Sequence, residues 1–287
     1  GRPIEQCPLP AECAEGYFVP PTLIEIQSLS DLKEEIFGPV IHVQRFAAEE
    51  LPGVIEQINA AGYGLTLGIH SRIDETISLI SEQARVGNIY VNRNMVGAVV
   101  GVQPFGGEGL SGTGPKAGGP LYLHRLAGTS NVTPEMLQAT PSDVPAPLPA
   151  ALKCLADWAE RNGKDSLLKR CHDDAAASLL ALRLNLPGPT GELNSLHFAP
   201  RGRMLCLAAD NEQMLHQLAA VFATGNQPVA VDCPLMQKML AGLPQELSRQ
   251  IELTARNNYA SLAGVLITTS DDPALWQDLA ATEGILL

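Results

Sequence analysis

Two short stretches of the chain carry residues whose types and spacing could do chemistry. The first is Glu-Glu-Ile-Phe-Gly-Pro-Val at 34–40, in which a pair of carboxylates precedes an aromatic ring and a Gly-Pro turn. An ionised carboxylate in such a pair can accept hydroxyl donors. On composition alone, the same residues also fit a turn with two solvated glutamates.

The second stretch, residues 96–120, is rich in glycine, and Gly107, Gly109 and Gly112 have the spacing G-x-G-x-x-G. A dinucleotide loop with that spacing needs a strand directly before it and a helix directly after it, because the helix N-terminus receives the pyrophosphate. Here the glycines and prolines of 114–120 are incompatible with a regular helix. We therefore expect a turn-rich segment that does not bind phosphate.

The overall charge and the cysteines exclude several classes of function. The net charge is −12 over 287 residues, whereas a nucleic-acid surface needs clustered Lys and Arg. The six cysteines form no C-x-x-C pair, which indicates reduced thiols in a cytoplasmic protein, and no metal site is expected. Cys7 and Cys13 each have acidic neighbours, which disfavour the thiolate that a nucleophile needs.

The elements that must position these stretches alternate between strands and helices. Apolar alternation predicts strands at 22–26, 40–46, 64–71 and 88–92. Helical periodicity and end signals predict helices at 48–61 and 74–87. This alternation is typical of an α/β fold.

A second α/β domain is predicted after residues 127–149, a Pro-, Ser- and Thr-rich segment that reads as a linker. We expect helices at 150–161 and 166–184, a βαβ unit at 204–232 and a further strand at 264–270. The turn of the βαβ unit has no glycine and carries Asp210, so we interpret this domain as a Rossmann-like scaffold without a bound dinucleotide.

Three ordered motifs resemble the aldehyde dehydrogenase superfamily: Glu-Glu-Ile-Phe-Gly-Pro-Val, Asn-Ile-Tyr-Val-Asn-Arg-Asn at 88–94, and Gln-Pro-Phe-Gly-Gly-Glu-Gly-Leu-Ser-Gly-Thr-Gly at 103–114. Residues 16–126 are similar to one branch, the Δ1-pyrroline-5-carboxylate dehydrogenase module of the bifunctional proline utilization A family. Residues 188–203 resemble the extra C-terminal domain of its long forms. The resemblance implies a portion of an aldehyde dehydrogenase catalytic domain at 1–126, the linker at 127–149, and a Rossmann-like α/β domain at 150–287.

The resemblance also implies an activity, the NAD-dependent oxidation of glutamate γ-semialdehyde to glutamate in proline catabolism. By motif match, Glu35 binds the nicotinamide ribose hydroxyls of NAD and Phe37 packs beside the nicotinamide ring. The backbone N–H groups of Gly97 and Ala98 are expected to hold the α-carboxylate of the substrate, and Phe105 to line its aliphatic part.

No segment of the G-Q-x-C type is present, so we expect the nucleophilic Cys and the general-base Glu to lie upstream, and this piece to be inactive alone. The sequence reads as starting and ending within domains. The full-length protein is expected to bind FAD outside these residues, to form a homo-oligomer and to associate peripherally with the inner membrane. Two alternatives stay open: a dehydrogenase for a different aldehyde, and a non-catalytic lid or assembly module.

Overall fold

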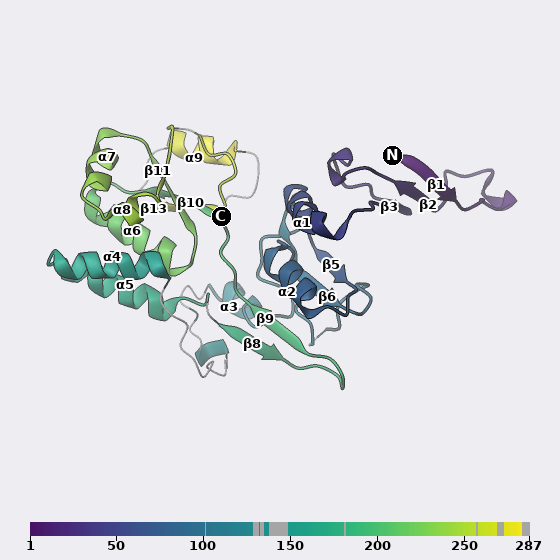
Figure 1. Cartoon of the computed structure of the whole chain (residues 1–287), viewed down its shortest axis with the longest axis horizontal. Coiled ribbons are helices and arrows are strands. Elements are labelled where there is room, and N and C mark those ends of the chain that lie inside the picture. The colour runs from purple at the N-terminus through teal and green to yellow at the C-terminus, as the bar shows by residue number, and fades with distance from the viewer. Residues whose placement is uncertain are drawn as a thin grey trace. The chain divides into compact units, whose positions relative to one another are not determined.

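The computed structural model describes residues 1–100, 102–128, 132, 135–137, 149–180, 182–256, 258–268 and 273–282 (Figure 1). Packing divides the chain into two units. The first comprises Gly1–Gly97 with Gly106–Gly114, and the second comprises Ala98–Phe105 with Pro115–Leu287. Among the helices of the described ranges, none is both long enough and apolar enough to cross a membrane.

The first unit begins with a three-stranded sheet of order β1-β2-β3, formed by β1 (Arg2–Gln6), β2 (Thr22–Glu25) and β3 (Val40–Val43). β1 pairs antiparallel with β2, and β2 pairs parallel with β3. The strands predicted at 22–26 and 40–46 are confirmed, although both are shorter than predicted. β1 was not predicted, because all five of its residues are exposed and its sequence lacks apolar alternation.

The rest of the first unit is built around a parallel βαβ element. It consists of β5 (Thr66–Ile69), α2 (Asp74–Gln83) and β6 (Asn88–Val91), preceded by α1 (Leu51–Ala60). α1 tolerates Pro52 because a proline in the first turn removes no helical hydrogen bond. All four elements confirm the sequence prediction, with ends that differ by a few residues.

The G-x-G-x-x-G glycines serve tight chain packing. β4 (Tyr63–Gly64) pairs antiparallel with β7 (Glu108–Gly109), and Gly109 has a φ of 59° that favours glycine. A Cβ on Gly107 would lie 2.6 Å from the Cβ of Ser111. The next helix is α3 (Tyr122–Leu126), which begins well after these glycines, so the strand–loop–helix geometry of a phosphate loop does not form here.

The second unit is centred on a parallel sheet of order β12-β11-β10-β13. Its strands are β10 (Arg203–Leu207), β11 (Gln227–Val231), β12 (Glu252–Thr254) and β13 (Gly264–Ile267). Parallel strands carry apolar side chains on both faces, and here Cys206 and Leu205 belong to different core clusters.

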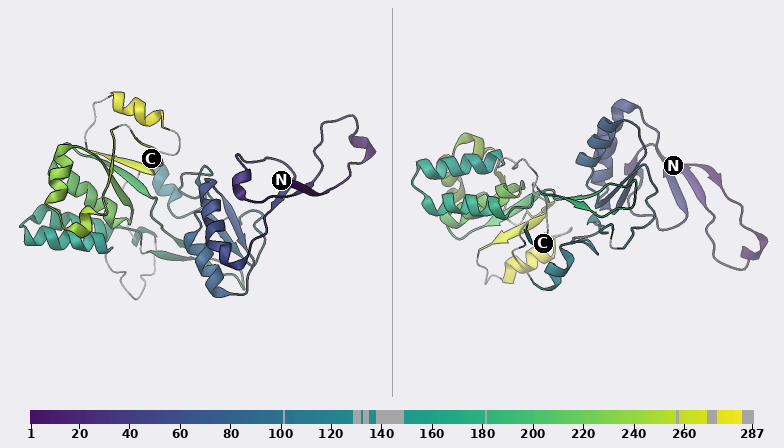
Figure 2. Two further views of the ribbon diagram at one scale, coloured as in Figure 1. Left: turned by 45° about the horizontal axis from the view of Figure 1, so that its top comes forward. Right: turned by 90° about the horizontal axis from the view of Figure 1, so that it is seen from below.

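Helices pack on the two faces of this sheet. One cluster gathers α4 (Ala150–Arg161), α5 (Asp165–Ala177), α6 (Asn211–Ala223), α7 (Pro234–Ala241) and α8 (Gln245–Ser248). The other cluster contains Tyr259 and Leu262, which precede β13, and Leu279, which lies in α9 (Pro273–Ala280). Figure 2 shows α9 on the side of the sheet opposite α4 and α5, so the second unit is a three-layer α/β/α domain. The fold class expected from the sequence is confirmed.

A β-hairpin interrupts the helix that the sequence predicted over 166–184. α5 ends at Ala177, and β8 (Arg183–Leu186) then pairs antiparallel with β9 (Asn194–His197). The helix does not continue past Ala177. The Ser178 hydroxyl donates to the Ala223 carbonyl at 2.7 Å, and Leu184 pairs with Leu196 across the hairpin. In Figure 1 this hairpin extends away from α4 and α5.

Short 3-10 helices complete the described elements; they lie at Ala11–Cys13, Leu29–Asp31, Ala48–Glu50 and Glu135–Leu137. Most of the predicted linker at 127–149 lies outside the described residues. So do the last two residues of the strand predicted at 264–270 and the final residues 283–287.

Candidate functional site

Glu35 and Phe37 lie in an irregular segment of the first unit, between the Leu29–Asp31 turn and β3. Both residues are exposed, and Phe37 as a whole is 94% accessible. Covering so open an aromatic ring with a ligand would remove its apolar surface from water, which is favourable. In the described part of the chain Glu35 makes no hydrogen bond, so its carboxylate is available to a ligand.

Gly97 and Ala98 follow β6 at the point where packing divides the chain, since Gly97 ends a segment of the first unit and Ala98 begins one of the second. Gly97 has a φ of 75°, in the left-handed region that favours glycine. A Cβ there would meet no atom within 4 Å, so backbone conformation, and not crowding, accounts for this glycine. The N–H groups of Gly97 and Ala98 bond to no other group of the described chain.

Phe105 is half-buried and is fixed through its backbone. Its N–H donates to the Ala117 carbonyl at 3.0 Å, and the Ala117 N–H donates back at 2.8 Å. Close packing supports the same turn, because a Cβ on Gly119 would lie 3.1 Å from the Cβ of Pro104. The glycines after Phe105 therefore allow the chain to fold back beneath it.

Gln103 is a residue of this region that the sequence did not single out. It is only 8% exposed, and its side-chain carbonyl accepts the Val99 N–H at 3.0 Å. Its amide nitrogen donates to the Glu192 carboxylate at 3.3 Å, in the turn between β8 and β9. No local pattern signals this contact, because its partners are 89 residues apart.

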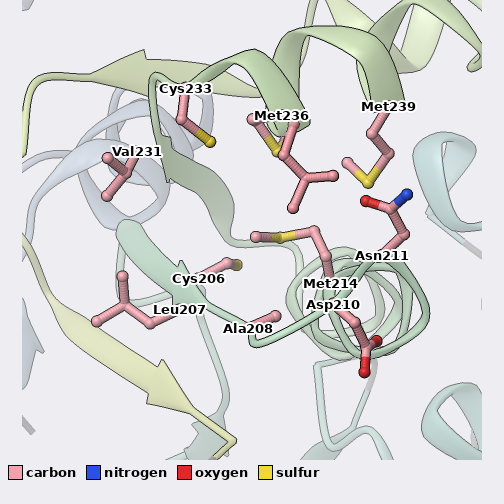
Figure 3. Close-up of a pocket in the computed structure, with 11 residues that line it drawn as sticks. Cys206, Leu207, Ala208, Asp210, Asn211, Met214, Val231, Cys233, Met236 and Met239 are labelled. Atoms are coloured by element: carbon pink, nitrogen blue, oxygen red, sulfur yellow. The ribbon is translucent and has the colours of Figure 1, made fainter.

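A cavity of about 150 Å³ lies at the carboxyl ends of β10 and β11, between α6 and α7 (Figure 3). Five sulfur-containing side chains line it: Cys206, Met214, Cys233, Met236 and Met239. Rossmann-like sheets bind ligands where the strand order reverses, which is here between β10 and β13, so this cavity lies beside that position and not at it. Burial raises the pKa of the Cys206 thiol to about 12 and that of Cys171, in the adjacent core, to about 11.

The N-terminus of α6 beside this cavity is already capped by the chain itself. The Asp210 carboxylate accepts the Gln213 N–H at 2.8 Å, and the Gln213 side chain accepts the Ala209 N–H at 3.1 Å. These side chains stand where a dinucleotide pyrophosphate would need free N–H donors. Over the described ranges, the structure holds no group of three or more His, Cys, Asp and Glu side chains suited to a metal ion.

Comparison with known proteins places the first part of the chain. Residues 4–132 match the aldehyde dehydrogenase family. We call residues 4–132, the part of the chain that this match covers, the aldehyde dehydrogenase segment. The segment contains Glu35, Phe37, Gly97, Ala98 and Phe105, while the second-unit cavity lies outside it.

Similar proteins extend over both parts of the chain. The "Bifunctional protein PutA" of Escherichia coli K12 is 45% identical over 288 residues, which cover 96% of this chain and 22% of that protein. The "1-pyrroline-5-carboxylate dehydrogenase" of Bacillus thuringiensis is 40% identical over 124 residues, which cover 42% of this chain and 24% of that protein. The chain thus spans about a fifth to a quarter of the length of these relatives.

One solved structure shares the fold across most of the chain. Proline utilization A from Corynebacterium freiburgense superimposes with a TM-score of 0.59 at 24% identity, over 93% of this chain and 25% of that protein. The fold of the matched segment and of the α/β domain that follows it therefore resembles that of one solved protein.

Proposed function

We propose that this chain is part of a longer bifunctional polypeptide and contributes to an NAD-dependent dehydrogenase that oxidises glutamate γ-semialdehyde to glutamate in proline catabolism. The names of its relatives support this reading, because a PutA protein matches 96% of the chain and a 1-pyrroline-5-carboxylate dehydrogenase matches 42% of it. The observation that carries the proposal is the pair of consecutive unbonded N–H groups at Gly97 and Ala98.

Glu35 and Phe37 are the residues of this chain that would hold NAD. An exposed carboxylate without a partner in the described chain can accept two ribose hydroxyl donors, and a fully open aromatic ring can pack against the nicotinamide. The two side chains therefore fit the cofactor. NAD⁺ supplies the hydride acceptor when bound.

Gly97 and Ala98 would bind the carboxylate end of the substrate. Successive N–H groups next to a left-handed residue form a concave anion site, and the φ of Gly97 provides that conformation. Phe105 would pack against the methylene groups and keep water from the aliphatic part of the substrate. The residues of this chain thus bind and orient the substrate.

The covalent chemistry would belong to other parts of the polypeptide. The nucleophilic Cys and the water-activating Glu are proposed to come from residues upstream of this chain, as is an FAD site. Neither Cys7 nor Cys13 belongs to this site. Assembly as a homo-oligomer and peripheral membrane association complete the proposal for the whole protein.

The second unit has a non-catalytic role in this proposal. Because the N-terminus of α6 is capped by Asp210, we assign the domain as a scaffold that covers or braces the dehydrogenase and binds no dinucleotide. A second candidate function, oxidation of a different aldehyde on the same fold, would need no anion site at Gly97 and Ala98.

Replacing Ala98 in the longer polypeptide separates the two functions. Ala98→Leu keeps the backbone N–H, but its larger side chain should block the carboxylate from reaching it. We therefore expect the KM for glutamate semialdehyde to rise by about tenfold or more, the cost of losing a hydrogen bond to a charged group. The KM for an uncharged aldehyde such as propanal should stay nearly unchanged. Val100→Leu, at an exposed position of the same loop, is the matched control. Unchanged semialdehyde kinetics with altered propanal kinetics would show that the anchor is wrong.

A further inference from the structure

Gln103 closes a tight turn directly after the Gly97–Ala98 pair. Its side-chain oxygen accepts the Val99 N–H at 3.0 Å. The Val99 carbonyl in turn accepts the N–H groups of Val102 at 3.1 Å and of Gln103 at 3.0 Å. Three hydrogen bonds therefore hold Val99, the residue that follows Ala98, in one conformation.

The orientation of the Gln103 amide follows from its two partners. An N–H donor at Val99 requires the oxygen of the amide, and a carboxylate at Glu192 requires its nitrogen. Reversing the amide would set donor against donor and acceptor against acceptor. Since Gln103 is nearly fully buried, water offers little compensation for that mismatch.

Glu192 is itself held in place by the turn of the β8–β9 hairpin. Its N–H donates to the Pro189 carbonyl at 3.0 Å, and the Asn194 amide donates to the Pro187 carbonyl at 3.1 Å. Gly191 has a φ of 90°, a conformation that favours glycine. The hairpin therefore presents this carboxylate from a defined position of the second domain.

The charge on Glu192 strengthens the hydrogen bond between the Gln103 side chain and the Val99 N–H. A hydrogen bond to a carboxylate is stronger than one between neutral groups, and it polarises the amide so that its oxygen becomes a better acceptor. Residues 98–105 and the hairpin belong to the same packing unit, so the contact lies within one compact body. The hairpin thus supports the loop that is proposed to bind the substrate carboxylate.

We propose that Gln103 and Glu192 are positioning residues for substrate selectivity: through Val99, they hold the loop so that the Gly97 and Ala98 N–H groups face a carboxylate. The inference rests on the proposed function. It gives the C-terminal domain a direct part in choosing carboxylate-bearing aldehydes over uncharged ones.

The test uses the longer polypeptide and two substrates, glutamate semialdehyde and pentanal. We expect Glu192→Ala to raise the KM for the semialdehyde by about five- to tenfold, the range of one charge-assisted hydrogen bond, with kcat and the KM for pentanal unchanged. Glu192→Gln keeps an acceptor but loses the charge, so it should raise the semialdehyde KM less than Glu192→Ala does. Glu160→Ala removes the same charge from an exposed position of α4 and serves as the control.

A reciprocal exchange tests the direction of the bond. Gln103→Glu sets two carboxylates against each other and should raise the semialdehyde KM more than Glu192→Ala does. Adding Glu192→Gln to that variant restores a donor opposite an acceptor, so most of the loss should be recovered. If Glu192→Ala folds poorly, recovery of the semialdehyde KM in the double variant still tests the pairing, because Glu and Gln have nearly the same size.

The outcomes distinguish this inference from the proposed function. If Ala98→Leu discriminates between the substrates while Glu192→Ala changes both KM values equally or neither, the positioning role is wrong and the anchor stands. If Ala98→Leu shows no discrimination, the anchor itself fails. Absence of recovery in the double variant would also overturn the pairing of Gln103 with Glu192.

Discussion

At the scale of single residues, the thiols occupy contrasting environments. Cys171 and Cys206 are buried, and burial raises their pKa values to about 11 and about 12. Cys7 is exposed, and Cys13 and Cys233 are half-buried. Because the thiolate is the reactive form, two features protect the buried thiols from reaction: reagents cannot reach them, and they stay protonated.

The buried thiols should make the second unit less stable at alkaline pH. A thiol ionises near pH 9 in the unfolded chain but near pH 12 at Cys206, so the unfolded state releases its proton first. This stabilisation is complete below pH 9 and is lost as the pH rises toward 12, by about 1.4 kcal/mol per pH unit. We expect Cys206→Ala to weaken this pH dependence, measured by urea unfolding at pH 8 and pH 10.5. Equal slopes in both proteins would contradict the prediction.

At the scale of elements, α6 depends on its own cap. Asp210 precedes the helix with extended backbone angles and accepts the Gln213 N–H. The same side chain gives the helix a stable start and removes an N–H donor that an anionic ligand would use. The local stability of α6 and the proposed absence of a dinucleotide site therefore depend on the same residue, Asp210.

Replacing Asp210 should destabilise the protein only if the new side chain cannot accept the Gln213 N–H. We expect Asp210→Ala to lower the free energy of unfolding by about 1 kcal/mol, whereas Asp210→Asn, which keeps an acceptor, should cost much less. Chemical denaturation measures both, with Glu212→Ala in the first turn as a control. If the Asn variant were as unstable as the Ala variant, a capping role for Asp210 would be ruled out.

At the scale of the whole molecule, the two units can be observed separately. Both tryptophans of the chain, Trp158 in α4 and Trp276 in α9, lie in the second unit. Their fluorescence reports the unfolding of that unit, while circular dichroism reports both.

A pair of core substitutions makes use of this separation. Leu218 is fully buried in α6, and Ile55 is buried in α1 of the first unit. We expect Leu218→Ala to lower the stability seen by fluorescence by about 2–5 kcal/mol, the usual cost of such a truncation. Ile55→Ala should change the dichroism transition and leave the fluorescence transition in place. A shift of the fluorescence midpoint by Ile55→Ala would show that the units unfold together.

Elements with strong local signals could be predicted from the sequence. The βαβ unit at 204–232 formed as expected, because its apolar strands flank a periodic helix with an aspartate cap. The β8–β9 hairpin was missed, since Leu184 and its neighbours continue a helical pattern as readily as they begin a strand. Tertiary pairing with β9 decided between the two.

The candidate site was predictable only in part for the same reason. Glu35, Phe37 and Gly97 stand in recognisable motifs, although their roles stay predictions. The role of Gln103 was not predictable, because its side chain is oriented by the carboxylate of Glu192, 89 positions later in the sequence. Local periodicity carries no information about such a pair.

The contact between Gln103 and Glu192 also has a consequence for the order of events during synthesis. A ribosome adds about 5–20 residues per second, so the 89 residues between the two partners take roughly 4–18 s to translate. During that interval the loop after Gly97 exists without its brace. The first unit can fold earlier, but the loop gains its contact with Glu192 only after residues 183–197 have left the ribosome and formed the hairpin.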